Sequence, residues 1–201
     1  MIKKRLLRTF FYILIGISIG GLATLYQIKN EKQSDGKPAI VATNFGGAFE
    51  LTNHLGETVT DKNFSNQYRL IYFGFTYCPA ICPTELQKIT MALNELGKTG
   101  EKIKPLFITV DPERDTVETM KGYVSLFHPN LVGLTGTPKQ IETAKNAYKI
   151  YAAKVKDDTM QEYTMDHSSF IYFMGPDDTL YYIFKIDDTA EDMVKRIKKY
   201  L

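Results

Sequence analysis

The two cysteines of the chain, Cys78 and Cys82, lie in the segment 78–83 with the sequence CPAICP. A β-like run precedes this segment and a helix-like run follows it. Two thiols with three residues between them can form a disulfide, exchange one with a partner, or bind a soft metal ion. Two cysteines are too few for a disulfide-scaffolded secreted fold. An apolar core must therefore stabilise the chain, and the thiols are available for chemistry.

The proline after each cysteine predicts the local geometry. A residue before proline is disfavoured in the α region, so Cys78 and Cys82 should both be extended, with Cys82 as N-cap and Pro83 as the first helical residue. Free N–H groups at a helix start favour the thiolate by about 0.3 to 1 kcal/mol. Regular i, i+4 spacing separates two Cβ atoms by about 5 to 6 Å, whereas a relaxed disulfide needs about 3.8 Å. The spacing suits a bridging metal ion at least as well as disulfide exchange.

Three histidines are candidates for a third ligand. His54 falls in a predicted hairpin turn and His128 ends a predicted helix, so we expect structural roles for both. His167 opens a predicted strand whose end can lie beside the cysteine loop. The spacing of these residues in the sequence does not show whether the imidazole contacts the two thiols. Two thiolates and one imidazole form a soft, three-coordinate set that suits Cu(I), whereas Zn²⁺ normally takes a fourth ligand. Met160 and Met165 are candidate auxiliary ligands, but loop and core roles are the expectation for them.

The order of the predicted elements indicates an α/β fold. The pattern predicts a hairpin in residues 46–63, strands at 69–75, 104–110, 131–134, 169–174 and 180–186, helices at 83–98, 117–127, 138–151 and 190–200, and a polar loop at 154–160. Strands that alternate with helices in this way predict one central mixed sheet with helices on both faces.

The segment 111–116 (DPERDT) follows a predicted central strand, at the sheet edge where ligands usually bind in open α/β folds. Asp111 could therefore support a metal ligand or help to dock a partner. The expected role of the segment is structural. It combines a proline turn, a helix cap by Asp115 or the next threonine, and an ion pair of Arg114 with a nearby carboxylate.

The N-terminal segment predicts a membrane anchor. The 17 residues from Phe10 to Tyr26 carry no charge and would give about 25 Å of helix, slightly less than a hydrocarbon core of about 30 Å. Flanking leucines and a snorkelling Arg8 can close that gap. A cleaved signal peptide is the alternative, but no clear Ala-x-Ala site follows the run. We expect a basic cytoplasmic end at residues 1–9, a transmembrane helix at 10–28, a linker at 29–38 and one globular domain at 39–201.

Charge distribution predicts the side of the membrane and excludes one class of partner. The basic cluster before the apolar run should stay in the cytoplasm, which predicts a single-pass protein of the bacterial inner membrane with its globular domain in the periplasm. Residues 1–29 hold five of the 25 basic residues and no acidic one, so the remainder has 20 basic and 23 acidic residues and a net charge of about −3. Without a basic stripe, this domain is not expected to bind nucleic acid.

Three motifs together resemble the Sco/SenC family of copper-binding, membrane-anchored, thioredoxin-like proteins. They are the CPAICP segment, the VDPERDT segment at 110–116, and Asp166-His167 ahead of the GPD turn at 175–177. The resemblance covers roughly residues 39–201. It implies a thioredoxin-like fold in which Cys78, Cys82 and His167 bind one copper ion, as Cu(I) or Cu(II).

The resemblance also implies a function in assembly of the binuclear CuA site of cytochrome c oxidase subunit II. The expected partners are that subunit or its assembly factors, and a protein that donates copper. A metallochaperone of this kind binds and transfers an ion and performs no turnover. The alternative is an enzyme, a thiol–disulfide oxidoreductase in which Cys78 and Cys82 reduce a partner's cysteines and His167 only tunes their pKa values. A third alternative is a peroxidase that shares the fold.

Overall fold

The structure is a computed structural model of the 201-residue chain, and it describes residues 20–21, 45–156 and 163–201. The chain divides into two units, Met1–Pro38 and Ala39–Leu201. Within the first unit only Gly20 and Gly21 are described, both in helical conformation, so the predicted anchor and linker otherwise lie outside the described residues. In the described ranges, no helix is both long and apolar enough to span a bilayer.

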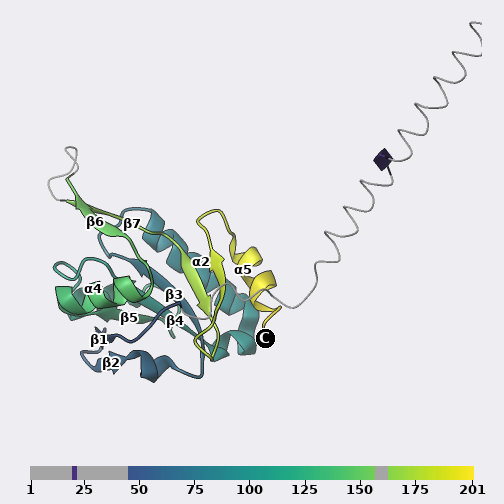
Figure 1. Cartoon of the computed structure of the whole chain (residues 1–201), viewed down its shortest axis with the longest axis horizontal. Coiled ribbons are helices and arrows are strands. Elements are labelled where there is room, and N and C mark those ends of the chain that lie inside the picture. Colours follow the sequence, from purple (N-terminus) through teal and green to yellow (C-terminus); the bar gives the residue numbers. More distant parts are fainter. Residues whose placement is uncertain (1–19, 22–44, 157–162) are drawn as a thin grey trace, which may run out of the picture. The chain divides into compact units, whose positions relative to one another are not determined.

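The second unit is built on a seven-stranded mixed sheet (Figure 1) with the strand order β2-β1-β5-β4-β3-β8-β9. Its strands are β1 (Glu50–Asn53), β2 (Thr58–Thr60), β3 (Tyr68–Gly74), β4 (Ile103–Thr109), β5 (Val132–Thr135), β8 (Ile171–Met174) and β9 (Leu180–Phe184). Strands β3, β4 and β5 run parallel, and an antiparallel hairpin flanks them on each side. All but the first residue of β3 are buried, as expected for a parallel strand that is covered on both faces.

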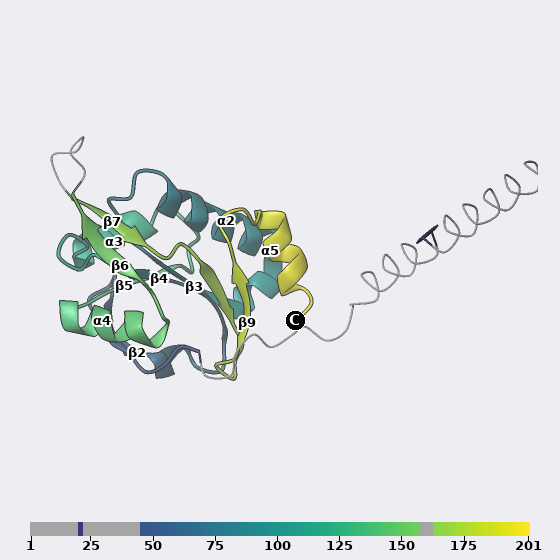
Figure 2. The ribbon, with the colours of Figure 1, turned by 45° about the horizontal axis from the view of Figure 1, so that its top comes forward.

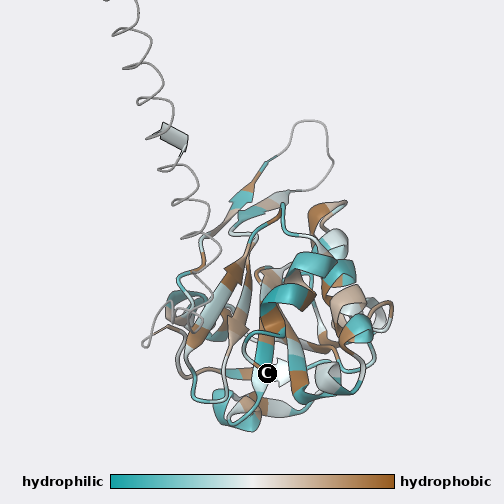
Figure 3. Cartoon of the chain, turned by 90° about the vertical axis from the view of Figure 1, so that its right-hand side faces the viewer, coloured by the Kyte–Doolittle hydropathy of each residue, from teal (hydrophilic) through white to brown (hydrophobic). Residues whose placement is uncertain are grey.

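Helices cover both faces of this sheet, as the sequence predicted. They are α2 (Ile81–Leu96), α3 (Val117–Val124), α4 (Pro138–Ala147) and α5 (Ala190–Ile197), with short 3-10 turns η1 (Asp61–Phe64) and η2 (Gly97–Lys102). Figure 2 shows α2 and α5 on one side of the sheet and α4 on the other. In Figure 3, hydrophobic colour gathers on the strands between the helices, while the exposed helix turns are hydrophilic.

The side chains of β3 point alternately to the two faces of the sheet and so contact both helical layers. Tyr72 stacks on Phe107 of β4, which in turn contacts Tyr123 of α3, so these side chains fill the face that α2 and α3 cover. The next residue, Phe73, points the other way and packs against Tyr148 at the end of α4. Successive side chains of a strand point to opposite faces. One short run of sequence therefore contributes to both halves of the core.

A second, two-stranded sheet was not predicted. It consists of β6 (Ala152–Val155) and β7 (Thr164–His167), where the sequence predicted a polar loop at 154–160 followed by a strand from Ser169. Both strands are partly exposed, with only short apolar stretches, so they lack the pattern that identifies a buried strand. His167 ends β7 and does not open the buried strand β8.

Candidate metal centre

The two cysteines and His167 come together near the end of β3. The Cys82 Sγ lies 3.6 Å from the His167 Nε2, although 85 residues separate them in the chain. The Cys78 Sγ accepts a hydrogen bond of 3.4 Å from the backbone N–H of Cys82. Both thiols are free, so no disulfide joins them. The structure thus places Cys82 between the other two predicted site residues, in contact with each.

The start of α2 differs from the prediction. The N-cap is Ala80, so Cys82 is the second helical residue and Pro83 the third, and the expected extended Cys82 at the N-cap is wrong. Proline is tolerated there because the first N–H groups of a helix have no partner within the helix. The alanine side chain cannot cap these groups. The Cys78 sulfur faces them instead: it accepts a hydrogen bond from the N–H of Cys82, and the backbone of Ala80 and Ile81 also lowers its pKa.

The environment divides the thiols into one thiolate and one thiol. A hydrogen bond from the Cys82 side chain, followed by those from the backbone N–H groups, lowers the pKa of Cys78 to about 5. The same bond, together with burial, raises the pKa of Cys82. Cys82 is fully buried beneath the half-buried Cys78, and it also receives a hydrogen bond of 3.4 Å from the Tyr72 hydroxyl. Cys78 is therefore the nucleophile of the pair at neutral pH.

We expect alkylation of the reduced protein to reveal this asymmetry. Between about pH 6 and 8 the rate of Cys78 modification by iodoacetamide should change little, because the thiolate already predominates above about pH 5. An ordinary cysteine, with a pKa of about 8.5, would gain about tenfold in rate per pH unit over this range. Mass spectrometry should find the adduct on Cys78 and leave Cys82 unmodified. A tenfold rise per unit at Cys78 would contradict this assignment.

Gly74, the last residue of β3, makes room for the buried thiol. A Cβ atom at this position would lie 2.8 Å from the Cys82 Sγ and 3.0 Å from ring atoms of Tyr72 and Phe107. Any side chain at position 74 would therefore push against the Cys82 sulfur and the rings of Tyr72 and Phe107. This close approach explains a glycine at the end of a buried strand.

Gly74→Ala should therefore lower the free energy of unfolding by roughly 1 to 3 kcal/mol, the usual effect of overpacking a core. Urea unfolding measures this loss. Gly122→Ala is the matched control, because a Cβ atom at Gly122 on α3 meets no atom within 4 Å. The control should be neutral or more stable, by up to about 1 kcal/mol, since alanine favours helix. Equal stability of the two variants would show that the space at Gly74 is not needed.

The imidazole of His167 is oriented with a lone pair toward the sulfur. Its Nδ1 lies 3.1 Å from the backbone oxygen of Ser168, which can only accept a hydrogen bond, so Nδ1 carries the proton. The Nε2 lone pair therefore faces Cys82. The ring packs edge-on against Phe75 and Tyr72, with centroid distances of 5.7 and 6.3 Å. A histidine fixed in this tautomer can ligate a metal ion or accept a thiol proton.

A cavity of about 290 Å³ opens beside the site. Its lining is mainly apolar and comprises Phe75, Cys78, Pro79, Ala80, Ile81, Thr164, Met165, Asp166, His167 and Ser169. Met165, for which a loop or core role was expected, packs against the core and borders the cavity, whereas Met160 lies outside the described residues. A larger cavity of about 580 Å³ lies between β9 and α5 and has no cysteine or histidine in its lining, so size alone does not identify the reactive site.

The donor set fits a soft ion. Bonds of about 2.3 Å to sulfur and about 2.0 Å to nitrogen, at roughly 120°, would place the two donor atoms about 3.7 Å apart. The observed distance between the Cys82 Sγ and the His167 Nε2 is 3.6 Å. Within the described parts of the chain, however, no three His, Cys, Asp or Glu side chains already form a complete metal-binding group. A shift of the Cys78 sulfur would have to complete the set.

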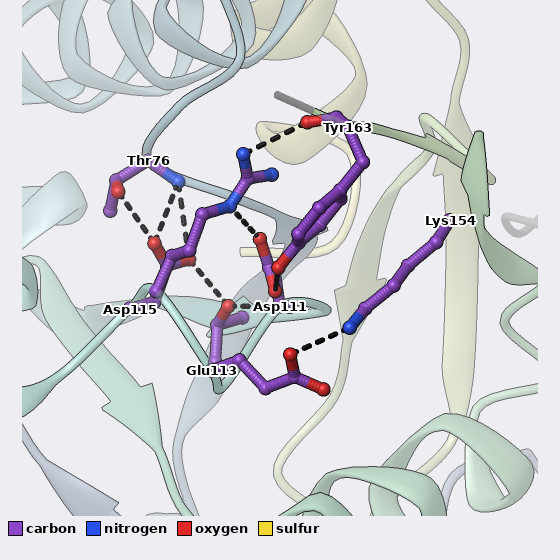
Figure 4. A network of polar contacts seen from close by, with 8 residues as sticks. Thr76, Asp111, Glu113, Asp115, Lys154 and Tyr163 are labelled. Carbon is purple, nitrogen blue, oxygen red and sulfur yellow. Dashed lines mark hydrogen bonds and ion pairs between the residues drawn. The ribbon is translucent and has the colours of Figure 1, made fainter. Parts of the chain in front are cut away.

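The DPERDT segment has the predicted structural role (Figure 4). The fully buried Asp115 accepts hydrogen bonds from the backbone N–H of Thr76, from its hydroxyl at 2.5 Å, and from the Thr109 hydroxyl at 2.5 Å. Its backbone oxygen accepts a further bond from Thr135. The residue thus connects the ends of three neighbouring strands, and Thr76 starts the cysteine loop. As predicted, Arg114 pairs with a carboxylate, that of Asp111, and a threonine caps α3.

The other two histidines take part in local structure, as expected. The Nδ1 of His54 accepts a hydrogen bond of 3.2 Å from the backbone N–H of Gly133 on β5. The Nδ1 of His128 accepts one of 3.2 Å from the N–H of Asn130 in the loop after α3. Each ring therefore supports a turn or a strand connection.

Comparison with known proteins relates this site to one family. The sequence model of the SCO1/SenC family matches residues 37–201. The human protein SCO1 homolog, mitochondrial, is 42% identical over 176 residues, which cover 81% of this chain and 57% of that protein. An Arabidopsis SCO1 homolog is 39% identical over 85% of this chain and 51% of its own length. The chain thus spans little more than half the length of these two relatives.

Solved structures agree in fold. The structure of Bradyrhizobium japonicum ScoI with copper bound has a TM-score of 0.72 and 43% identity, and covers 78% of this chain and 99% of that one. Yeast Sco1 with copper bound has a TM-score of 0.71 and 38% identity, over 78% and 88% of the two chains. The predicted thioredoxin-like fold, with a mixed central sheet and flanking helices, is confirmed for the globular unit. By its sequence and its fold, this chain belongs to the SCO1/SenC family.

Proposed function

We propose that the protein is a copper metallochaperone that binds one copper ion through Cys78, Cys82 and His167 and assists assembly of the CuA site of cytochrome c oxidase. The distance of 3.6 Å between the Cys82 Sγ and the His167 Nε2 carries this proposal. The copper-bound structures of two relatives support the choice of metal. In this function copper is cargo that the protein takes up and passes on.

Each residue has a distinct part in the capture of the ion. Cys78 is the accessible thiolate, so it meets an incoming Cu(I) ion first. Cys82 must lose its proton to become a ligand, which makes binding release a proton and strengthen as the pH rises. His167 offers the Nε2 lone pair that faces Cys82. A set of only three donors leaves the ion open to attack by a partner's thiolate, and ligand exchange can then transfer it.

X-ray absorption tests the proposed donor set. The purified full-length chain, reduced and kept in detergent, is loaded with Cu(I) and analysed for metal content. We expect one copper per chain and a first shell of two sulfur atoms and one nitrogen. A shell of sulfur alone, or one that is unchanged in the His167→Ala variant, would refute the ligand set.

The second candidate function is thiol–disulfide exchange, which the unequal pKa values of the two thiols favour. The Cys78 thiolate would attack a disulfide of the partner and form a mixed disulfide. Cys82 would then attack the Cys78 sulfur, which releases the partner as a dithiol and leaves a Cys78–Cys82 disulfide. Two electrons thus pass to the partner. Metal transfer and this reaction both require the reduced thiol pair.

The N-terminal sequence and the family support a location for this function. We propose a single-pass protein of the bacterial inner membrane, with residues 1–9 in the cytoplasm, an anchor at 10–28, a linker at 29–38 and the domain 39–201 in the periplasm. Oxidase subunit II or its assembly factors, and a copper donor protein, are the proposed partners. Protease added to spheroplasts should degrade the domain. Protection in spheroplasts would refute this orientation.

A further inference from the structure

The strand that carries His167 is not part of the main sheet. In the described ranges, β6 and β7 pair only with each other, while the cysteines follow β3 of the seven-stranded sheet. Backbone hydrogen bonds of that sheet therefore do not fix the orientation of β7 relative to the two sulfurs. The His167 end of β7 is held through β8, which begins at Ile171 and pairs there with Tyr72 of β3. Side-chain contacts with the cysteine loop must hold the other end of β7.

Arg114 makes contacts with both segments. Its guanidinium carbon lies 3.9 Å from the centroid of the Tyr163 ring and 4.8 Å from that of the Tyr77 ring. Tyr163 directly precedes β7, and Tyr77 is the neighbour of Cys78. The Arg114 Nη1 also donates a hydrogen bond of 2.9 Å to the backbone oxygen of Tyr163. One side chain thus links the hairpin to the loop that bears the thiols.

Asp111 anchors this link to the main sheet. Its carboxylate accepts one bond of 2.5 Å from the Arg114 Nε and another of 2.8 Å from the Tyr163 hydroxyl (Figure 4). Asp111 is 1% exposed, and its own backbone N–H donates to the Thr109 hydroxyl at the end of β4. Asp111, Arg114 and Tyr163 thus contact one another, and Asp111 ties all three to the end of β4. We call these three residues the clamp.

We infer that Arg114 is a positioning residue for the metal site, because it holds the His167-bearing hairpin against the cysteine loop. This inference rests on the proposed function. Tyr163 lies four positions before His167, about 13 Å at 3.3 Å per residue, so Arg114 restrains one end of β7 and the junction with β8 restrains the other. Without the Arg114 contacts, β7 can pivot about its junction with β8, which would turn the His167 ring out of its present orientation toward Cys82. A planar guanidinium suits the task, since it stacks on aromatic rings and donates in several directions at once.

A double-mutant cycle on the reduced full-length chain tests this positioning role. Competition with a chromophoric Cu(I) chelator measures the affinity. Arg114→Ala should lower the Cu(I) affinity by about tenfold or more, the usual effect of losing a residue that orients a ligand. In the His167→Ala background the same substitution should cause no further loss, because no imidazole remains to be positioned. An equal loss in both backgrounds would show a merely structural role and overturn the inference.

Two further variants control the experiment. Lys154→Ala removes a cation that lies 4.6 Å from the same Tyr163 ring and its exposed ion pair with Glu113, and the affinity should stay within about twofold. If Arg114→Ala does not fold, Tyr163→Leu replaces it in the double-mutant cycle, because this variant removes the ring that contacts Arg114 and the hydroxyl that bonds Asp111. A His167→Ala variant with unchanged affinity would refute the proposed ligand set itself, whereas normal affinity of Arg114→Ala alone would refute only the clamp.

Discussion

Replacement of His167 by alanine should lower the Cu(I) affinity of the reduced protein by about 100-fold or more, or roughly 2.7 kcal/mol of binding free energy. The substitution removes the proposed nitrogen donor and leaves two sulfur donors. The thiol pair itself should keep its chemistry, because the low pKa of Cys78 depends on hydrogen bonds from the Cys82 side chain and the backbone. The variant should therefore still form and lose its disulfide.

Chelator competition measures the affinity, and the rate of disulfide formation with oxidised glutathione measures the thiol chemistry. His128→Ala is the matched control, since it removes an imidazole whose Nδ1 accepts a bond from the Asn130 N–H and should leave both quantities unchanged. If the His167 variant binds copper as tightly as the parent, His167 is not a ligand. Thiol–disulfide exchange would then become the leading function.

Replacement of Asp115 by alanine should lower the free energy of unfolding by roughly 2 to 4 kcal/mol. The N–H and hydroxyl of Thr76 and the hydroxyl of Thr109 would lose their acceptor, and each buried donor left unsatisfied costs about 1 to 3 kcal/mol. Part of the loss is offset, because burial raises the pKa of Asp115 and its carboxylate is therefore itself destabilised in the native protein. Urea unfolding measures the difference.

Glu113→Ala is the control for Asp115→Ala. Glu113 lies in the same loop, but it is exposed and its ion pair with Lys154 lies at the surface, so its loss should change the stability by no more than about 0.5 kcal/mol. The Asp115 variant should also show altered Cys78 reactivity, since Thr76 begins the cysteine loop. A stability loss below about 1 kcal/mol would mean that water replaces the carboxylate without difficulty.

The main sheet and its helices were predictable from local patterns. The parallel strands β3 and β4 are continuous apolar runs, a pattern that burial on both faces requires, and threonines mark the start of α3, α4 and α5. The β6–β7 hairpin was missed because its half-exposed residues have no clear period. The predicted start of α2 at Pro83 was wrong because proline fits the third helical position as well as the first.

The amino-acid sequence by itself determined which atoms are available for chemistry here: two thiols with three residues between them, placed between a buried strand and a helix. Spacing along the chain also fixed the order of the elements. Only the tertiary structure decided that an imidazole 85 residues away lies 3.6 Å from one sulfur, and that Cys78 is the thiolate while Cys82 is the buried thiol. The reason is physical, because pKa values and ligand sets depend on contacts through space between segments that no local pattern connects.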